Sequence, residues 1–459
     1  MVGEIEQVLE RAAALVTPSS KEIRKLEAIC EIITSKINAT LDKEKSSTRP
    51  QLILGGSYAR GTWLKGSHDL DFFLLYPVDL PRDKLETTAI RSASEAMSGF
   101  PINLRYAEHP YVESFVDGVR VNVVPCYDVA PGEWQSAADR SPYHTKYILS
   151  KLDDNLRLQV RLLKKFTKSI EVYGAEVKIQ GFSGYVCEVL TIKYGSFVGA
   201  LEEFTKLKPG QVISTEPFDE DLAETFKSTI VILDPVDTTR NLGSAISARN
   251  VGKLALEAKR FLTKTSLTFF LPRKIDHLPR GSLLSSMIVV SFRNEPRSPD
   301  ILWGELKRSM SSISEKLEAL GFNVLRSSSA SNEKDESAFV FLLSSLDLER
   351  NYVRVGPEYF RTEEVQKYYE KNRKRALLTW VGNDGRMESV FERDKDMTHA
   401  QAALKFILGK QRIDSVGISP RVKSELLQGF KISGADRLSQ AKTTPDWLLK
   451  PISELATND

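Results

Sequence analysis

The sequence has few cysteines, no long apolar run and no leader-like N-terminus. Its three cysteines, Cys30, Cys126 and Cys187, are far apart, and none belongs to a C-x-x-C pair. This spacing argues against a disulfide framework and against a thiolate zinc site, so a reducing cytoplasm is the expected location. The N-terminus lacks a basic region followed by an apolar one, and no stretch approaches the ~18 apolar residues of a membrane span. Neither secretion nor membrane insertion is expected.

Glycine and proline are not abundant in the sequence, and neither sign of charge is in large excess. The 459 residues include 26 Gly and 20 Pro, with 41% apolar and 27% charged residues, which excludes collagen-like and disordered compositions. Because 64 Lys and Arg nearly balance 61 Asp and Glu, the net charge of +3 identifies no partner. Residues 141–180 and 253–280 are locally positive, which suits either contact with a polyanion or a solvated helix face.

A mixed sheet flanked by helices is predicted over residues 1–147. Apolar residues at three- and four-residue spacing predict a helix after Thr17-Pro18, and a second helix is expected over 81–97. Asp117-Gly118 predicts a hairpin turn between two strands. Short apolar runs predict strands at 52–54, 70–76, 102–107, 111–116 and 119–124.

The rest of the chain is predicted to be helical first and then α/β. Helical periodicity dominates residues 146–209; a buried strand follows at 230–233, and a helix is predicted to begin at Arg240-Asn241. The basic, proline-containing segment 271–280 is a predicted boundary. Beyond it, strand-like runs at 287–292, 339–343 and 376–380 alternate with helix-like runs at 302–320, 363–372 and 399–408. At roughly 150 residues per domain, about three domains fit this length. We therefore predict an α+β protein with a mixed-sheet head (1–147), a helical central region (148–265) and an α/β C-terminal half (266–459).

The stretch around Ser57 and Asp69 is the most informative for chemistry. Gly55-Gly56-Ser57 follows a strand, so backbone amides and a hydroxyl can approach a phosphate at the start of a helix. Asp69 and Asp71 begin an apolar strand two positions apart, which places both carboxylates on one face. A lone Asp-x-Asp is more often a turn or surface pair, but paired carboxylates on one sheet face also suit Mg²⁺, which keeps substrate phosphates as further ligands. A phosphate-binding turn beside such a pair predicts a nucleoside triphosphate substrate.

The whole pattern, G-G-S-x-x-x-G-T followed by S-x-D-h-D-h with h apolar, resembles the signature of the DNA polymerase beta-like nucleotidyltransferase superfamily. Within it, the chain is most similar to the archaeal (class I) CCA-adding enzymes, the tRNA nucleotidyltransferases that build and repair the 3′ end of tRNA. Beyond about residue 280 the length is compatible, but no specific motif matches. Further motifs follow in the family's order: VVPCY (123–127), SPYH (141–144), RLLK (161–164), YGAE (173–176), GFSGY (181–185) and DPVDTTRN (234–241).

This resemblance implies template-free addition of CCA to tRNA from CTP and ATP by two-metal phosphoryl transfer. Asp69 and Asp71 would hold Mg²⁺ as the catalytic carboxylates. The C-terminal half would bind the acceptor and T arms of tRNA through shape, phosphates and 2′-hydroxyls. A homodimer is left open. The residues implied at the nucleotide are Gly56, Ser57, Arg60, His144, Lys164, Tyr173 and Arg240.

Four of these nucleotide residues have plainer alternatives, and for three of them the resemblance implies a specific role. Lys164 would be a point charge on the triphosphate and Tyr173 a hydroxyl donor to it, while Arg240, near a helix start, would face the base edge. The alternatives are an interface position for His144, a basic helix face for Lys164, a packed ring for Tyr173 and an ion pair with Asp237 for Arg240.

One position departs from the family pattern. The family carries a third carboxylate just before the apolar-Val-Pro sequence of the third strand, and that position here is Asn122. Strand alternation places Asn122 on the face of Arg120, where its amide oxygen can ligate Mg²⁺ but adds no charge. Asp117 and Asp128 are too far along the strand to replace it. The sequence leaves open a weaker metal site, another acid that approaches in the fold, or impaired activity.

Two other functions are consistent with part of the pattern. A poly(A) or oligoadenylate type of template-free nucleotidyltransferase shares the G-S and D-x-D elements, but YGAE, GFSGY and DPVDTTRN weigh against it. A catalytically weak or silent tRNA-binding homologue is suggested by Asn122 alone. The presence of Asp69, Asp71 and Lys164 weighs against that hypothesis, because paired carboxylates are costly without a function.

Overall fold

The computed structural model describes residues 2–43, 49–67, 69–106, 109–272, 282–440 and 444–457. The chain forms two compact units, Met1–Arg273 and Lys274–Asp459, which are described separately below. The boundary predicted at 271–280 lies outside the described residues from 273 onward. Within the described ranges, no helix is long and apolar enough to span a bilayer. The predicted α+β class is confirmed, whereas the division at residues 147 and 265 stays a prediction.

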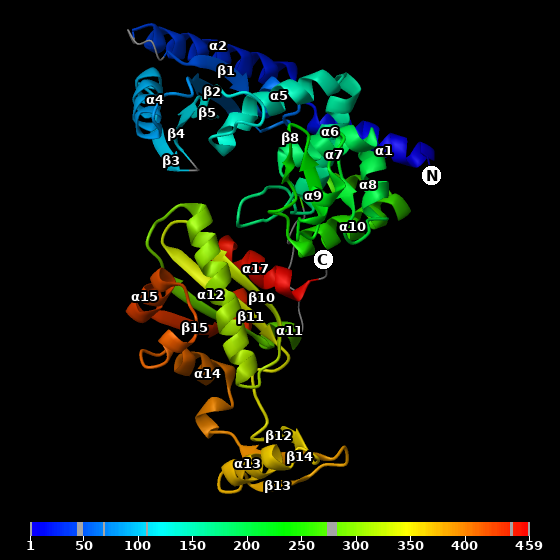
Figure 1. Ribbon diagram of the computed structural model, residues 1–459, viewed down its shortest axis with the longest axis vertical. Helices are drawn as coiled ribbons and strands as arrows, with labels where there is room; N and C mark the ends of the chain where they lie inside the picture. Colours follow the sequence, from blue (N-terminus) through cyan, green and yellow to red (C-terminus); the bar gives the residue numbers. More distant parts are fainter. Residues whose placement is uncertain are drawn as a thin grey trace. The chain divides into compact units, whose positions relative to one another are not determined.

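A mixed sheet of five strands forms the core of the head, in the order β1-β2-β5-β4-β3 (Figure 1). Strands β2 and β5 are parallel, and the other neighbours are antiparallel. Asp117 and Gly118 both have positive φ, as the predicted two-residue hairpin turn requires. The strands are β1 (Gln51–Gly55), β2 (Asp69–Tyr76), β3 (Ile102–Tyr106), β4 (Pro110–Val116) and β5 (Val119–Tyr127).

The two faces of this sheet differ in character. Leu70 and Phe72 of β2 and Val121 of β5 are buried on one face, under α2 (Ser20–Lys43) and α4 (Arg82–Ala96). Since successive side chains of a strand point to opposite faces, Asp69, Asp71 and Asn122 lie on the other face. Burial of the apolar side chains on one face therefore fixes the strand register that places the polar side chains together on the other face.

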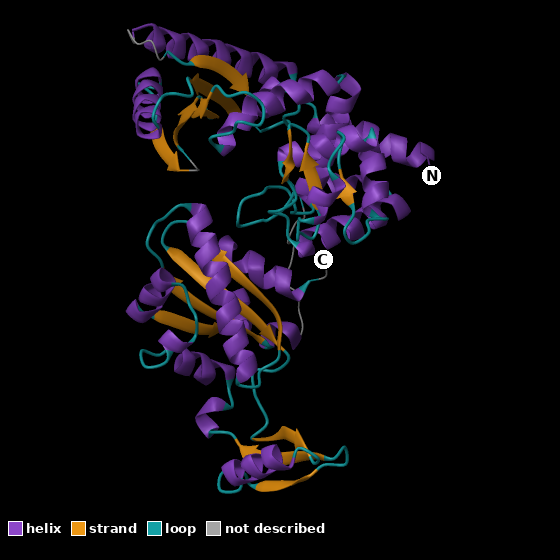
Figure 2. Ribbon diagram, in the orientation of Figure 1, coloured by secondary structure: helices purple, strands orange, loops and turns teal. Residues whose placement is uncertain are grey.

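Helices dominate the remainder of the first unit, as predicted (Figure 2). Their core includes a cluster of aromatic rings around Phe166, which contacts Phe197, Phe261 and Phe270. The helices are α1 (Val2–Val16), α3 (Gly56–Ala59), α5 (Arg140–Lys151), α6 (Asp154–Ser169), α7 (Gly184–Tyr194), α8 (Phe197–Phe204), α9 (Glu220–Glu224) and α10 (Ala248–Thr263), with 3-10 turns η1 (Ala137–Asp139) and η2 (Leu267–Phe270).

The prediction of a helix beginning at Arg240-Asn241 is wrong. These residues end strand β8 (Asp237–Asn241), which pairs with β7 (Val231–Asp234) beside β6 (Val212–Ile213). The side-chain amide of Asn241 accepts from Ile232 N of β7 at 2.9 Å and donates to O of Ile230, the residue before β7, at 3.1 Å. Asn241 thus extends the sheet, and α10 begins only after its N-cap Ser247.

The second unit alternates strands and helices, which confirms the predicted α/β character. An antiparallel sheet in the order β10-β11-β9-β15 packs against α12 and α17, and a smaller sheet has the order β12-β14-β13. Sequence analysis missed four of these strands, β10, β12, β14 and β15. The elements are α11 (Ser282–Ser285), β9 (Met287–Arg293), α12 (Pro299–Ala319), β10 (Val324–Ser331), β11 (Glu336–Leu343), β12 (Asn351–Glu358), α13 (Thr362–Asn372), β13 (Leu378–Val381), β14 (Arg386–Glu392), η3 (Lys395–Met397), α14 (Ala400–Ile407), η4 (Ile413–Ser415), α15 (Pro420–Gln428), β15 (Phe430–Gly434), α16 (Ala435–Gln440) and α17 (Asp446–Ala456).

Candidate active site

Strand register brings the two predicted carboxylates beside β5. Asp69 pairs with Arg120 and Asp71 with Asn122 in the parallel ladder. Arg120 donates to both oxygens of Asp69, from Nε to Oδ1 at 3.1 Å and from Nη2 to Oδ2 at 2.7 Å. The alternation argument therefore placed these four side chains correctly on one face.

Gly56 is required by the position of Asp71. It opens the short helix α3 with a φ of +68°, a conformation that favours glycine. A Cβ at this position would lie 1.9 Å from Oδ2 of Asp71. The glycine thus lets the α3 backbone approach the carboxylate closely, with Ser57 on the next residue of the turn.

Asn122 contacts Asp71, and one of its polar atoms stays without a partner. Its Nδ2 donates to Oδ1 of Asp71 at 2.8 Å, and its own Oδ1 is buried without a hydrogen-bond partner among the described residues. Burial raises the pKa of Asp71, as does the charge of Asp69, while the hydrogen bond from Asn122 lowers it. Two carboxylates and an unpartnered amide oxygen are hard oxygen donors, so this set fits a divalent metal. Across the described parts of the chain, no three His, Cys, Asp or Glu side chains lie close enough together to hold a metal ion.

A buried ion cluster lies behind the Gly-Ser turn, centred on Glu188 of α7. Arg60 Nε lies 2.9 Å from Oε2 of Glu188, and Lys164 Nζ donates to Oε1 at 2.8 Å. Thr62 also donates to Oε1, and its own hydroxyl accepts from Lys164 at 3.0 Å. Burial alone would raise the pKa of Glu188, but the two cations and these hydrogen bonds outweigh it and lower the pKa from 4.5 to about 2.

Sequence analysis missed Glu188, although a signal was present. The residue is an isolated acid in the apolar helical run Val186–Leu190, and a buried charge needs a partner. Its partners Arg60 and Lys164 were both predicted to contact the nucleotide, Lys164 at the triphosphate. The structure places both at Glu188, so their contact with a nucleotide stays a prediction.

Tyr173 lies next to this cluster through the GFSGY motif. Ser183 caps α7 by accepting from Val186 N, and Gly184 is the first residue of the helix. A Cβ on Gly184 would lie 2.8 Å from the Tyr173 hydroxyl and 3.4 Å from Lys164 Nζ. Burial raises the pKa of Tyr173, so its hydroxyl stays protonated and can donate a hydrogen bond.

A second cluster gathers His144 and Arg240 around Asp234. Asp234 has no exposed side-chain surface; its Oδ2 lies 2.8 Å from His144 Nε2 and accepts from Arg240 Nη1 at 3.1 Å. Tyr185 stacks on His144 with ring centroids 4.0 Å apart and donates to Asp234 at 3.3 Å. The alternative partner considered for Arg240, Asp237, instead pairs with Arg140 at 2.7 Å.

The two clusters meet at Tyr185. The guanidinium of Arg60 lies 6.0 Å from the centre of the Tyr185 ring, on whose plane His144 stacks. The charge of Arg60 also acts on Asp71, whose pKa it lowers. The structure therefore brings the predicted residues of the head and of the central region close together within the first unit.

A turn that opens a helix against paired carboxylates is typical of enzymes that transfer nucleotides, and comparison with known families agrees. Residues 35–144 match the family model described as nucleotidyltransferase domain, so the sheet with Asp69 and Asp71 is that of a nucleotidyltransferase. Residues 158–271 match the model for a tRNA nucleotidyltransferase second domain, and residues 280–434 match that for a CCA-adding enzyme C-terminal domain.

Full-length relatives identify the particular family. A CCA-adding enzyme of Saccharolobus islandicus is 33% identical over 443 residues, covering 96% of this chain and 99% of its own. Those of Sulfurisphaera tokodaii and Pyrobaculum neutrophilum are 35% and 36% identical, over 84% and 78% of this chain and 88% and 84% of theirs. The chain therefore belongs to the family of CCA-adding enzymes, which confirms the resemblance seen in its sequence.

As a member of this family, the chain is a tRNA nucleotidyltransferase, and enzymes of this kind use a divalent metal. Among solved structures, a cytoplasmic RNA terminal U-transferase aligns with a TM-score of 0.46 and 16% identity, over 59% of this chain and 99% of that one. That similarity is too low to support any inference.

Proposed function

We propose that this enzyme completes the 3′-terminal CCA of tRNA from CTP and ATP without a nucleic-acid template, and that Asp69, Asp71 and Asn122 hold Mg²⁺. One observation carries the assignment of the site. Asp71 and Asn122 pair in register on the polar face of the sheet, directly against the glycine that opens α3. The 3′-hydroxyl of tRNA would attack the α-phosphate, and pyrophosphate would leave. Bound there, Mg²⁺ would stabilise the negative charge of the phosphates during transfer.

The residues behind the turn are proposed to bind the triphosphate. The backbone amides at the start of α3 and the Ser57 hydroxyl would donate to phosphate oxygens, as amides at other helix N-termini do. Arg60 and Lys164 contribute two positive charges, of which Glu188 neutralises one. The pair and its counter-ion therefore carry a net charge of +1, and Tyr173 adds a neutral donor beside them.

Arg240 and His144 are proposed to contact the base. Asp234 accepts from Arg240 and contacts His144, and so orients both side chains. The Arg240 side chain remains 42% exposed, so part of its donor fork is available to the edge of a base. A fixed guanidinium offers a constant donor pattern to C and A in the absence of a template.

The C-terminal unit is proposed to bind the acceptor and T arms of tRNA. Exposed cations lie in the last turn of α13, at Lys371, and directly after it, at Arg373–Arg375, next to the exposed Leu377 and Leu378. Such a mixture of charge and apolar surface suits phosphates and the shallow groove of an RNA duplex. A cytoplasmic location belongs to the same proposal because the substrate is tRNA. The homodimer stays a prediction that light scattering of the full chain can test.

The decisive experiment incubates the protein with tRNA that ends before CCA, with Mg²⁺ and labelled CTP or ATP, separately and together. We expect two C residues from CTP alone and completed CCA from both nucleotides. Asp71→Asn serves as the inactive control, since it removes a metal-binding charge at constant size, and its tRNA affinity should stay within about threefold of wild type.

Other products would identify the alternatives. Repeated addition of A from ATP alone would indicate a poly(A)-type enzyme. Tight tRNA binding without any addition would indicate a catalytically silent homologue. Full activity of Asp71→Asn would contradict the assignment of the metal site.

A further inference from the structure

Glu113 of β4 lies opposite Asn122 in the sheet of the head. The antiparallel ladder pairs Glu113 with Asn122, while the parallel ladder pairs Asn122 with Asp71. Residues that oppose each other in neighbouring strands share a face, and their Cβ atoms are about 4.5–5.5 Å apart. Burial agrees, since Val112 and Val116 point into the core on the other face. Asp71, Asn122 and Glu113 thus form one row across three strands.

The carboxylate of Glu113 is nearly buried and has a replaceable partner. Its side chain is 6% exposed, and Arg105 of β3 contacts Oε1 from Nε at 2.9 Å and from Nη2 at 2.8 Å. Arg105 belongs to the edge strand of the sheet and is 46% exposed. Its guanidinium can therefore turn to solvent if the carboxylate turns toward a cation.

The neighbour of Glu113 along the row is the atom that lacks a partner. Oδ1 of Asn122 is buried and unpaired among the described residues, and Asn122 brings no charge to the site. Glu113 is one strand, about 4.8 Å, further from Asp71 than Asn122 is, and its side chain, one methylene longer than that of aspartate, covers part of that distance. The charges of Glu113 and Asp71 also both act on Arg120.

We propose that Glu113 is the third carboxylate of the metal site, supplied by β4 in place of the acid that β5 lacks at Asn122. The inference rests on the proposed function. Asp69, Asp71 and Glu113 then provide the three charges, and Asn122 lies between Asp71 and Glu113 as a neutral ligand or spacer. Glu113 must exchange Arg105 for the metal when the metal binds.

The test measures binding of Mn²⁺ alone to the full chain, by electron paramagnetic resonance of the free ion. We expect Glu113→Gln to weaken Mn²⁺ binding at least tenfold and to raise by a similar factor the Mg²⁺ concentration for half-maximal CCA addition. Asn122→Asp in the Glu113→Gln background should restore both, because it returns the charge from β5. Alone, Asn122→Asp should bring no gain, since it adds a like charge beside Glu113.

Arg105→Gln separates a metal ligand from a structural ion pair. If Glu113 binds the metal, this variant frees the carboxylate and Mn²⁺ affinity stays the same or rises. If Glu113 serves only to pair with Arg105, both single variants should lower the thermal midpoint equally, with Mn²⁺ affinity unchanged in Glu113→Gln. That result overturns the proposal. Weaker Mn²⁺ binding in Arg105→Gln also overturns it, and this binding can be measured even if Glu113→Gln fails to fold.

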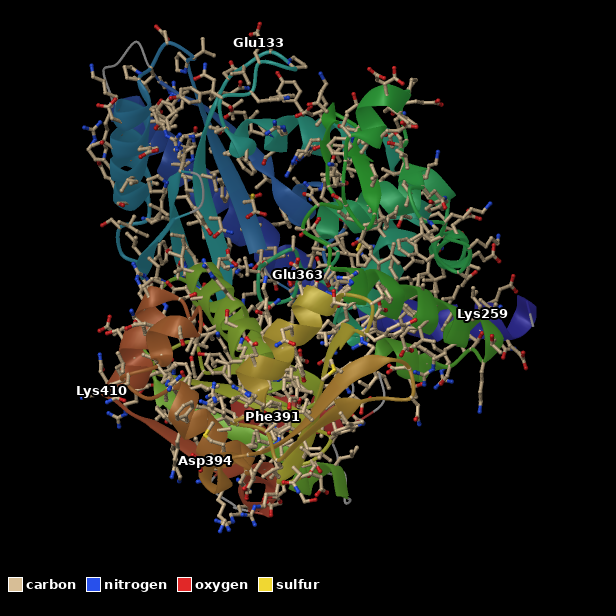
Figure 3. The ribbon with its side chains drawn as sticks, turned by 60° about the horizontal axis from the view of Figure 1, so that its bottom comes forward. Glu133, Lys259, Glu363, Phe391, Asp394 and Lys410 are labelled. Atoms are coloured by element: carbon tan, nitrogen blue, oxygen red, sulfur yellow. The ribbon has the colours of Figure 1, made fainter. Side chains whose placement is uncertain are left out.

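Two further variants distinguish this inference from the proposed function. Asp71→Asn should lose Mn²⁺ binding if the metal site is assigned correctly; retained binding there contradicts the proposed function itself. If Asp71→Asn loses Mn²⁺ binding while Glu113→Gln binds Mn²⁺ like wild type, only the proposed role of Glu113 is contradicted, and the proposed function stands. Glu133→Gln, an exposed acid in the loop after β5 (Figure 3), is the charge-matched control and should behave as wild type.

Discussion

At the scale of single residues, Glu188 shows how one buried acid organises a site made of cations. It has no exposed surface, yet its oxygens contact Arg60 and Thr62, which follow the Gly-Ser turn, and Lys164 of α6. Without Glu188, the guanidinium of Arg60 and the ammonium of Lys164 would be left close together and poorly solvated. The acid therefore keeps Arg60 and Lys164 in place whether or not they also contact a nucleotide.

Glu188→Gln should accordingly destabilise the protein. Removing one partner of a buried pair leaves an uncompensated charge, so we expect a loss of about 3–5 kcal/mol in the free energy of unfolding. Urea denaturation measures it. Glu203→Gln, which breaks the exposed pair with Lys206, is the control and should cost less than about 1 kcal/mol. Equal losses of unfolding free energy in the two variants would contradict a stabilising role for the buried ion cluster around Glu188.

The pH dependence of this stabilisation has a definite sign. The pKa of Glu188 is lowered in the folded state to about 2 from an ordinary 4.5. A lowered acid pKa stabilises the fold fully above the unfolded value, and this contribution is lost as the pH falls from 4.5 through 2. Wild type should therefore lose more stability than Glu188→Gln across that interval.

Arg240 is expected to act on nucleotide choice. Arg240→Ala removes donors to the base edge, and a good base contact is worth about 1–3 kcal/mol, or roughly 5–150-fold in selectivity. We expect selectivity for CTP and ATP over UTP and GTP to fall by a factor in this range, with pyrophosphorolysis less affected. Competition assays measure it, with Arg260→Ala on the exposed side of α10 as control. Unchanged selectivity would reduce Arg240 to an ion-pair partner of Asp234.

At the scale of elements, α3 and β2 are joined at one point of close approach. The first residue of α3 has no room for a side chain because the carboxylate of Asp71 occupies it. The turn and the strand therefore have to be treated as one element of the site, in which phosphate-binding amides and a metal-binding acid are set against each other.

Gly56→Ala tests this close approach. The new Cβ would displace Asp71 and also strain a backbone with φ of +68°, so we expect CCA addition to fall at least a hundredfold. Gly99→Ala is the matched control, since Gly99 has φ of +95° but no atom within 4 Å of an added Cβ. It should lose stability of about 1 kcal/mol and little activity. Similar activity losses in both would show that backbone strain alone accounts for the effect.

At the scale of the whole molecule, tRNA is expected to bind through charge carried by the C-terminal unit. Arg373, Lys374 and Arg375 are three exposed cations in succession after α13. Each lysine or arginine that neutralises a phosphate releases counter-ions, which makes affinity fall with salt. The global net charge hides this local concentration.

Replacing Arg373, Lys374 and Arg375 together by alanine should weaken tRNA binding tenfold or more at low salt. The slope of log affinity against log salt should become shallower by up to about 2–3, at 0.7–0.9 for each lost phosphate contact. Affinity for free CTP should not change. A control with Lys21, Arg24 and Lys25 of α2, also exposed, should leave tRNA binding within about threefold; equal effects would remove the special role of the α13 segment.

Sequence alone predicted what depends on neighbours along the chain. The alternation of Asp69, Leu70 and Asp71 determined which face each side chain uses, and Asp117-Gly118 determined the hairpin, because both follow from local backbone geometry. The family motifs identified the enzyme. The same local reasoning failed at Arg240-Asn241, where a helix was predicted although these residues end strand β8 and Asn241 binds the backbone of β7.

Only the tertiary structure decided which charges meet. Glu188 contacts Arg60 across 128 residues of sequence, Asp234 rather than Asp237 accepts from Arg240, and Glu113 is opposite Asn122 because β4 and β5 pair in one particular register. The face of a strand on which a side chain lies is a local property. The partner of that side chain across a sheet or between helices depends on how the apolar faces pack together. The sequence therefore determined that two acids and an amide share one face, and the fold determined that a further acid stands beside them.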